Sequence, residues 1–357
     1  MATPFHSTVP VVASLPAGIE LTYFDSGPVV GSTSFTTLVL VHGCHFNSYG
    51  FKHLIPIAPQ VNLRLVLVQR RDYAGSSKYT DDEMSVLRSD NPTAFFGTAG
   101  EVMAQFVHYL VSNTEVCTAS EDRSSGGIAI AGWSIGNVFA QSMFFEGATL
   151  NEETYAAIEP YVLSLVLYDP PHCAFGIPTP PTLMHMFDPF HIKDPEESKQ
   201  KFRRWVSSYY DHDTEPDVLE LSNLDSRLET EQCVFKSWTP ALQEERTEDF
   251  PLRSDAIVIS KSVAQHHINR MSNNALFALN PRRFPLARVS FVHGKRSIWM
   301  CAFARHSIKR KYLELLSQGQ KDNIRSFHFI DSEEGNHFVG SHYVYALWLA
   351  NFKIDPL

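Results

Sequence analysis

The sequence GWSIGNVFA at residues 132–140 places Ser134 between two glycines, Gly132 and Gly136. It directly follows an apolar run rich in β-branched residues and leads into a segment with helical spacing. A serine at a sharp strand-to-helix turn holds its hydroxyl above the end of a sheet, and only small residues fit beside it. We therefore predict that Ser134 is a nucleophile rather than an ordinary helix N-cap. The amide of Ile135, at the start of the helix, would then face a developing oxyanion.

The segments on either side of this turn indicate an α/β fold. Apolar runs that are nearly continuous, rather than alternating with polar residues, are typical of parallel strands covered on both faces. Helical segments separate these runs, which favours a mostly parallel central sheet with helices on both faces and right-handed crossovers. The predicted strands are residues 36–43, 63–70, 127–133, 163–169, 288–294 and 324–331, and the predicted helices are residues 97–113, 135–147, 303–319 and 337–352.

One long segment interrupts the alternation of strands and helices. Residues 171–284 are rich in proline, aromatic residues and methionine. This segment is too long for a single crossover and too apolar for a disordered linker. We predict that residues 1–170 and 285–357 form the core domain, and that residues 171–284 form an inserted, mainly helical cap over one end of the sheet.

The composition narrows the classes of function. Hydrophobic residues make up 44% of the 357 residues, which is ample for a core, and the net charge of −9 is not gathered into blocks. This pattern indicates neither nucleic-acid binding nor an anionic membrane surface, and no apolar run is long enough to span a membrane. Five scattered cysteines suggest neither a disulfide framework nor a zinc site, and we see no signal peptide. We expect a cytoplasmic protein, and the sequence does not indicate its oligomeric state.

A second motif lies upstream of the serine. His42 and Gly43 end the predicted strand 36–43 and are followed by Cys44. Together with the G-x-S-x-G turn, this arrangement resembles the α/β-hydrolase fold superfamily, and within it uncharacterised fungal members. The resemblance implies that the loop after His-Gly donates a second amide to the oxyanion, here that of Cys44, with His45 as the alternative.

The resemblance also implies positions for the base and the acid of a triad. The superfamily carries its histidine on the loop after the last strand, which indicates His337 here. Its acid usually follows the penultimate strand, but residues 291–306 contain neither Asp nor Glu. The alternative location, at the end of the preceding strand, holds Asp169, which we predict as the acid; its other interpretation is a turn residue before two prolines. Asp331 and Glu334 are the remaining candidates.

This set of residues predicts a serine hydrolase that works through an acyl-enzyme. Such a triad needs no metal and no organic cofactor. The apolar insertion favours an ester, lactone or thioester with an apolar acyl group, and a serine at the turn argues against a dehalogenase or an epoxide hydrolase, which need a carboxylate there. Two other functions stay open: acyl transfer in secondary metabolism through the same triad, and a non-catalytic receptor or scaffold on this fold.

Overall fold

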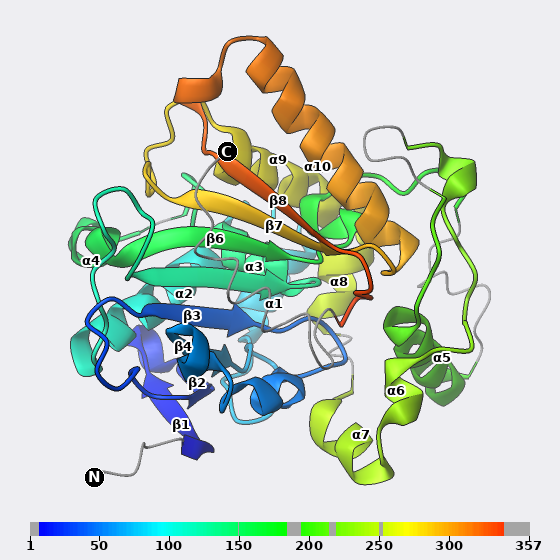
Figure 1. Ribbon diagram of the computed structural model, residues 1–357, viewed down its shortest axis with the longest axis horizontal. Coiled ribbons are helices and arrows are strands. Elements are labelled where there is room, and N and C mark those ends of the chain that lie inside the picture. Colours follow the sequence, from blue (N-terminus) through cyan, green and yellow to red (C-terminus); the bar gives the residue numbers. More distant parts are fainter. Residues whose placement is uncertain (1–6, 149, 184–193, 214–218, 250–252, 339–357) are drawn as a thin grey trace.

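The central feature of the computed structural model, which describes residues 7–148, 150–183, 194–213, 219–249 and 253–338, is an eight-stranded sheet (Figure 1). The strand order is β1-β2-β4-β3-β5-β6-β7-β8. Strands β3 to β8 run parallel to one another, whereas β2 is antiparallel to both β1 and β4. The strands are β1 (Ser7–Ser14), β2 (Glu20–Asp25), β3 (Thr36–Val41), β4 (Leu63–Val68), β5 (Ile128–Trp133), β6 (Val162–Tyr168), β7 (Arg288–Gly294) and β8 (Phe327–Ser332).

The six strands predicted from the sequence are confirmed as β3 to β8. Every residue of β4, β5 and β6 is buried, which explains why these strands read as continuous apolar runs. The parallel strands end at a common edge of the sheet (Figure 1). The turns after β3, β5, β6 and β8 therefore meet there, and the predicted site residues follow these strands.

The N-terminal hairpin of β1 and β2 was not predicted. Strand β1 is at the edge of the sheet and leaves apolar side chains in solvent, with Val9 67% and Val12 48% exposed. It contains Pro10, and its register shifts between Ser7 and Val11. Proline is tolerated at edges and bulges, where no ladder hydrogen bond is lost. An edge strand of this kind lacks the buried, continuous pattern by which the other strands were recognised.

Helices cover the sheet and extend beyond it. Helix α2 packs against α3, and α3 packs against β5 and α9. Helices α5, α6 and α7 lie beyond the carboxyl ends of the parallel strands, at the right of Figure 1. The α-helices are α1 (Asp81–Arg88), α2 (Thr93–Asn113), α3 (Gly136–Ser142), α4 (Glu152–Ile158), α5 (Pro195–Ser207), α6 (Val234–Ser237), α7 (Pro240–Arg246), α8 (Asp255–Ser260), α9 (Ser262–Phe277) and α10 (Trp299–Ser317). The 3-10 helices are η1 (Pro16–Gly18), η2 (Ser48–Leu54), η3 (Ala58–Val61), η4 (Glu159–Tyr161), η5 (His172–Phe175), η6 (Leu221–Asn223) and η7 (Lys321–Asn323).

The predicted helices 97–113, 135–147 and 303–319 correspond to α2, a shorter α3, and α10. The fourth, residues 337–352, lies almost wholly outside the described residues. Helix α9 belongs to the predicted insertion 171–284 but packs against α3 of the core, so the limits of a separate cap stay a prediction. Among the helices that are described, none is both long and apolar enough to cross a membrane.

Candidate active site

Ser134 occupies a tight turn between β5 and α3. Its φ angle is +55°, in the left-handed region that non-glycine residues rarely adopt. A Cβ atom added to Gly136 would lie 2.5 Å from the carbonyl oxygen of His42, and one added to Gly132 would lie 2.6 Å from the amide nitrogen of Asn137. Both positions therefore require glycine. The pattern in the sequence reflects backbone packing around a strained serine, as at a nucleophile turn.

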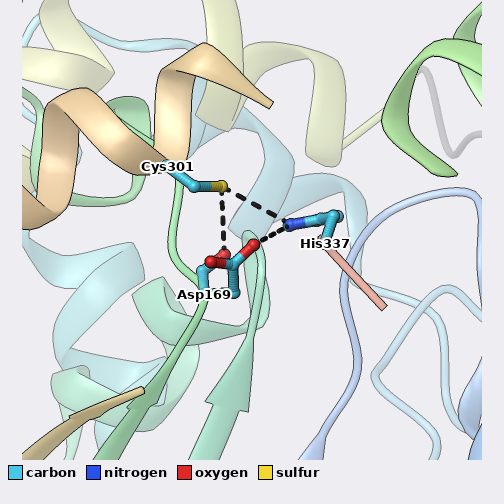
Figure 2. A group of neighbouring side chains, drawn as sticks. All are labelled: Asp169, Cys301 and His337. Atoms are coloured by element: carbon cyan, nitrogen blue, oxygen red, sulfur yellow. Dashed lines mark hydrogen bonds and ion pairs between the residues drawn. The ribbon is translucent and has the colours of Figure 1, made fainter. Parts of the chain in front are cut away.

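His337 and Asp169 are in direct contact, as Figure 2 shows. The Nδ1 atom of His337 lies 2.6 Å from Oδ2 of Asp169, and both side chains are buried. Asp331 instead pairs with Arg305, and the exposed side chain of Glu334 lies 3.7 Å from Arg296. Of the three candidate carboxylates, Asp169 is the one that the structure brings to His337.

Asp169 accepts hydrogen bonds from the end of β7 and the loop that follows it, where the sequence contains no Asp or Glu. Its Oδ1 atom accepts hydrogen bonds from Nδ1 of His293 (2.8 Å) and the amide of Gly294 (3.1 Å), and Oδ2 also accepts one from the hydroxyl of Ser297 (2.5 Å). Burial alone would raise the pKa of Asp169, but the hydrogen bonds from His293 and His337 lower it below its ordinary value. The carboxylate is therefore ionised. These donors were not predicted from the sequence, although His293 and Gly294 end β7, the strand adjacent to the one that Asp169 follows.

The ionised carboxylate fixes the tautomer of His337. An ionised carboxylate can only accept, so Nδ1 of His337 carries a hydrogen, and in the neutral imidazole the lone pair is then on Nε2, as a base requires. The indole nitrogen of Trp133 donates to the carbonyl oxygen of His337 at 2.8 Å and holds this loop beside Ser134. Ser134 and His337 are both described, and they form no hydrogen bond with each other in this structure. Such bonds are often long before substrate binds.

The thiol of Cys301 completes the cluster in Figure 2. Its sulfur lies 3.5 Å from Nδ1 of His337 and 3.3 Å from the carbonyl oxygen of Asp169. Burial raises the pKa of Cys301 well above its ordinary value, so the group is a neutral thiol. Metals are bound by thiolates, and Oδ2 of Asp169 is already engaged by Ser297 and His337. The ligating atoms of the three residues lie within 4.8 Å of one another, but their chemistry fits a hydrogen-bonded triad better than a metal centre.

The loop after β3 lies directly against Ser134. A Cβ atom added to Gly43 would lie 2.8 Å from Cβ of Ser134. The carbonyl oxygen of Gly43 accepts hydrogen bonds from Nδ1 of His42 (2.8 Å) and from Arg70 (2.9 Å). Because the Gly43–Cys44 peptide bond is trans, the amide of Cys44 points away from these donors. Among the described residues, no backbone carbonyl accepts a hydrogen bond from the amides of Cys44 and Ile135, as oxyanion donors require.

A buried ion pair fixes the orientation of this loop. Arg70 binds both carboxylate oxygens of Asp255, at 2.8 and 2.5 Å, and the hydroxyl of Tyr73 donates to the same carboxylate at 2.8 Å. All three side chains are buried. Asp255 begins α8 in the predicted insertion and is 185 residues from Arg70. The sequence offered no signal that would join them.

The predicted insertion also contacts the two loops of the site. The side-chain amide of Asn336, which precedes His337, donates to the carbonyl oxygen of Ser207 at the end of α5 (2.8 Å). Phe46, two residues after Cys44, forms an antiparallel bridge with Thr247, which follows α7. The contact of Asn336 with α5 therefore ties the loop that carries His337 to the predicted insertion.

A cavity of about 940 Å³ lies beside these loops. Its lining includes the immediate neighbours of the three candidate triad residues, namely Trp133, Tyr168 and Phe338. The ring centroid of Trp133 is 5.2 Å from that of His337, so one aromatic side chain touches both the cavity and the candidate base. The other lining residues are Phe46, Asn47, Gly50, Phe51, His53, Leu54, Ile57, Tyr209, Gln232, Cys233, Val234, Ser237, Trp238, Leu242 and Arg246.

Comparison with solved structures identifies the fold. An esterase from Exiguobacterium antarcticum is similar over 97% of this chain and 99% of its own, with a TM-score of 0.55 and 14% identity. A putative aryl esterase from Burkholderia cenocepacia (96% and 97% covered, TM-score 0.51, 12% identity) and haloalkane dehalogenase DpaA from Paraglaciecola agarilytica NO2 (98% and 93%, 0.51, 12%) are similar too. No protein-family model and no curated protein matches the chain in sequence. The likeness at this identity is one of fold, and it confirms the fold predicted from the sequence.

Proposed function

We propose, from the α/β-hydrolase fold of this chain and the geometry of its candidate site, that the protein is a serine hydrolase that cleaves an ester, lactone or thioester. The observation that carries this proposal is the 2.6 Å contact between His337 and a buried, ionised Asp169, with Ser134 at a strained turn nearby. A buried carboxylate that accepts hydrogen bonds from four donors, one of them the candidate base, is costly in free energy. Groups arranged in this way cluster at functional sites, and a catalytic triad explains why the carboxylate is there.

In the proposed reaction, Ser134 attacks the acyl carbon while Nε2 of His337 accepts the hydroxyl proton. Asp169 stabilises the imidazolium that forms, and the amides of Cys44 and Ile135 bind the oxyanion. The imidazolium then protonates the leaving group, and water attacks the acyl-enzyme with His337 again as the base. The serine at the turn favours acyl chemistry over dehalogenation or epoxide opening, which use a carboxylate nucleophile. The five cysteines are free thiols, which supports the proposed cytoplasmic location.

A non-catalytic binding protein is the second candidate. The observation that favours it is that Ser134 and His337 are not hydrogen-bonded in this structure. In this case the cavity would bind a small molecule and the serine would remain unactivated.

Labelling with a fluorophosphonate separates the two, because only an activated serine reacts. We expect the wild-type protein to be labelled, the variant Ser134→Ala to remain unlabelled, and the control variant Ser307→Ala on α10 to be labelled like wild type. A screen of ester and lactone libraries, with and without an added alcohol acceptor, then distinguishes hydrolysis from acyl transfer. A folded wild-type protein that is neither labelled nor active on any ester would favour the binding protein.

A further inference from the structure

The cavity beside the candidate triad is aromatic but contains one permanent charge. Phe46, Trp133, Trp238 and Phe338 pack edge-on against one another around it. Of its described lining residues, none is Asp or Glu, and Arg246 is the one with a permanent charge. In a mostly apolar ligand site, the few polar or charged side chains usually determine which ligand binds. The chemical group that best matches Arg246 therefore indicates the class of ligand.

Within the described residues, the guanidinium of Arg246 forms no ion pair, and the carboxylate of Glu245 offsets its burial only in part. It lies over the ring of Trp238, with its central carbon 4.8 Å from the ring centroid. Its Nε atom is buried and has no hydrogen-bond acceptor among these residues. The neighbouring carboxylate of Glu245 is bound by Lys52 at 3.3 Å. Burial lowers the pKa of Arg246, which is the mark of a cation separated from water without full compensation.

Backbone pairing fixes the position of Arg246 relative to the candidate oxyanion site. The amide of Asn47 donates to the carbonyl oxygen of Arg246 at 3.1 Å, and the amide of Glu248 donates to the carbonyl oxygen of His45 at 2.9 Å. Arg246 therefore lies opposite Asn47, three residues beyond Cys44. Three residues of chain span at most about 10 Å. The long side chain of Arg246 adds to this span, so varying the length of the acyl chain tests which substrate reaches both the guanidinium and the reacting carbonyl.

We propose that Arg246 binds a carboxylate at the far end of the substrate, so that the preferred substrate is an ester with an apolar body and a terminal carboxylate. This inference rests on the proposed function for the reacting end. The planar guanidinium matches a carboxylate in a bidentate pair. A single cation neutralises one carboxylate, whereas the dianion of a phosphate monoester would keep a charge uncompensated among aromatic rings.

The test compares p-nitrophenyl monoesters of succinate, adipate and suberate with the same compounds methylated on the free carboxylate. We expect wild-type kcat/KM to favour the free acid of the best chain length by about 10- to 100-fold, since a hydrogen bond to a charged group contributes that much. Arg246→Gln should remove this preference, so that the free acid and the methylated ester are turned over with equal kcat/KM, while Arg246→Lys should retain part of it. Arg310→Gln, an exposed arginine on α10, is the matched control and should behave like wild type.

Two further arms complete the test. The butyryl ester of para-hydroxybenzoate carries its carboxylate on the leaving group instead of the acyl group. A higher kcat/KM for this ester than for its methylated form, lost in Arg246→Gln, would overturn the acyl-side placement and show that Arg246 binds the leaving group. Binding is measured separately in Ser134→Ala, as the rise in Tm with monomethyl adipate relative to dimethyl adipate. A binding preference without turnover or labelling would sustain the carboxylate site and overturn the hydrolase. Ester turnover with equal kcat/KM for acid and methyl ester, or a preference that survives in Arg246→Gln, would sustain the hydrolase and overturn the carboxylate site.

Discussion

Asp169 receives its donors from two segments that are far from it in sequence. His293, Gly294 and Ser297 come from the loop after β7, and His337 comes from the loop after β8. The parallel register, in which Tyr168 is paired with Val292, brings the first loop to the carboxylate. A short list of candidate acids could be drawn from the sequence because Asp169 ends a strand. The donors could not be, because a serine and a histidine acquire this function only through that register.

At this residue the chemistry can be tested by removing a single charge. Asp169→Asn keeps the size of the side chain but takes away the negative charge and favours the wrong histidine tautomer. We expect kcat to fall by about ten-thousand-fold. Asp331→Asn, which breaks the pair with Arg305 instead, should leave kcat close to wild type. Steady-state kinetics on any ester found in the library screen checks both, and equal losses in the two variants would contradict the assignment.

The buried side chain of His45, on the loop after β3, should make the stability of the protein depend on pH. Burial, together with Arg203 and Lys199, lowers the pKa of His45 from its ordinary 6.5 to about 3. The unfolded chain therefore binds a proton that the folded protein does not bind between these values. The stability that this group contributes is full above about pH 6.5 and is lost as the pH falls toward 3.

Urea unfolding at two pH values measures this contribution. Between about pH 7 and about pH 5, the free energy of unfolding should fall by about 2 kcal/mol through His45. His45→Gln should remove that part of the decrease and leave the part that comes from other buried histidines such as His42, whose pKa is also lowered by burial. A decrease of unchanged size in His45→Gln would show that the residue is solvated.

At the scale of elements, the turn between β5 and α3 depends on close backbone contacts. A methyl group on Gly136 would press against the carbonyl oxygens of Val41 and His42 at the end of β3. We expect Gly136→Ala to destabilise the protein by about 1–3 kcal/mol, because these backbone atoms cannot move aside cheaply. Gly50→Ala in η2 is the control, since its new methyl group would meet no atom within 4 Å. Thermal unfolding of both variants checks the contrast, and similar losses in Tm would show that the turn is more open than described.

The burial of each helix and strand explains why some elements were predicted from the sequence and others were not. Strands β3 to β8 were recognised because burial on both faces leaves a continuous apolar run. Strand β1 contains a proline and exposes its valines, so its sequence does not differ from that of a loop. Helix α9 lies within the predicted insertion 171–284, and its buried face, which includes Ile268 and Met271, belongs to the main hydrophobic core. Order along the chain does not tell which layer a helix joins.

For the molecule as a whole, the pair of Arg70 and Asp255 joins the predicted insertion to the loop beside Ser134. Both charges are buried, so removing one leaves the other without compensation. We expect Asp255→Asn to cost about 3–5 kcal/mol in the free energy of unfolding, and to lower kcat because the carbonyl of Gly43 loses its fixed donor.

A surface ion pair provides the comparison for this prediction. Asp81 lies 3.4 Å from Arg253 and is fully exposed, so Asp81→Asn should leave the unfolding midpoint unchanged. Urea titrations of the two variants, run alongside kinetics, distinguish them. If Asp255→Asn unfolds at the wild-type midpoint, the carboxylate is not the partner that stabilises Arg70.

The backbone pairing between residues 45–47 and 246–248 limits how this protein can be redesigned. Excising residues 194–249 to obtain a minimal catalyst would strip the loop after β3 of its hydrogen-bonded neighbour and open the aromatic cavity to water. A chimaera that exchanges this segment for that of another enzyme would meet a mismatched loop unless the two stretches were transplanted together. In directed evolution, the two stretches should accordingly be randomised as one library.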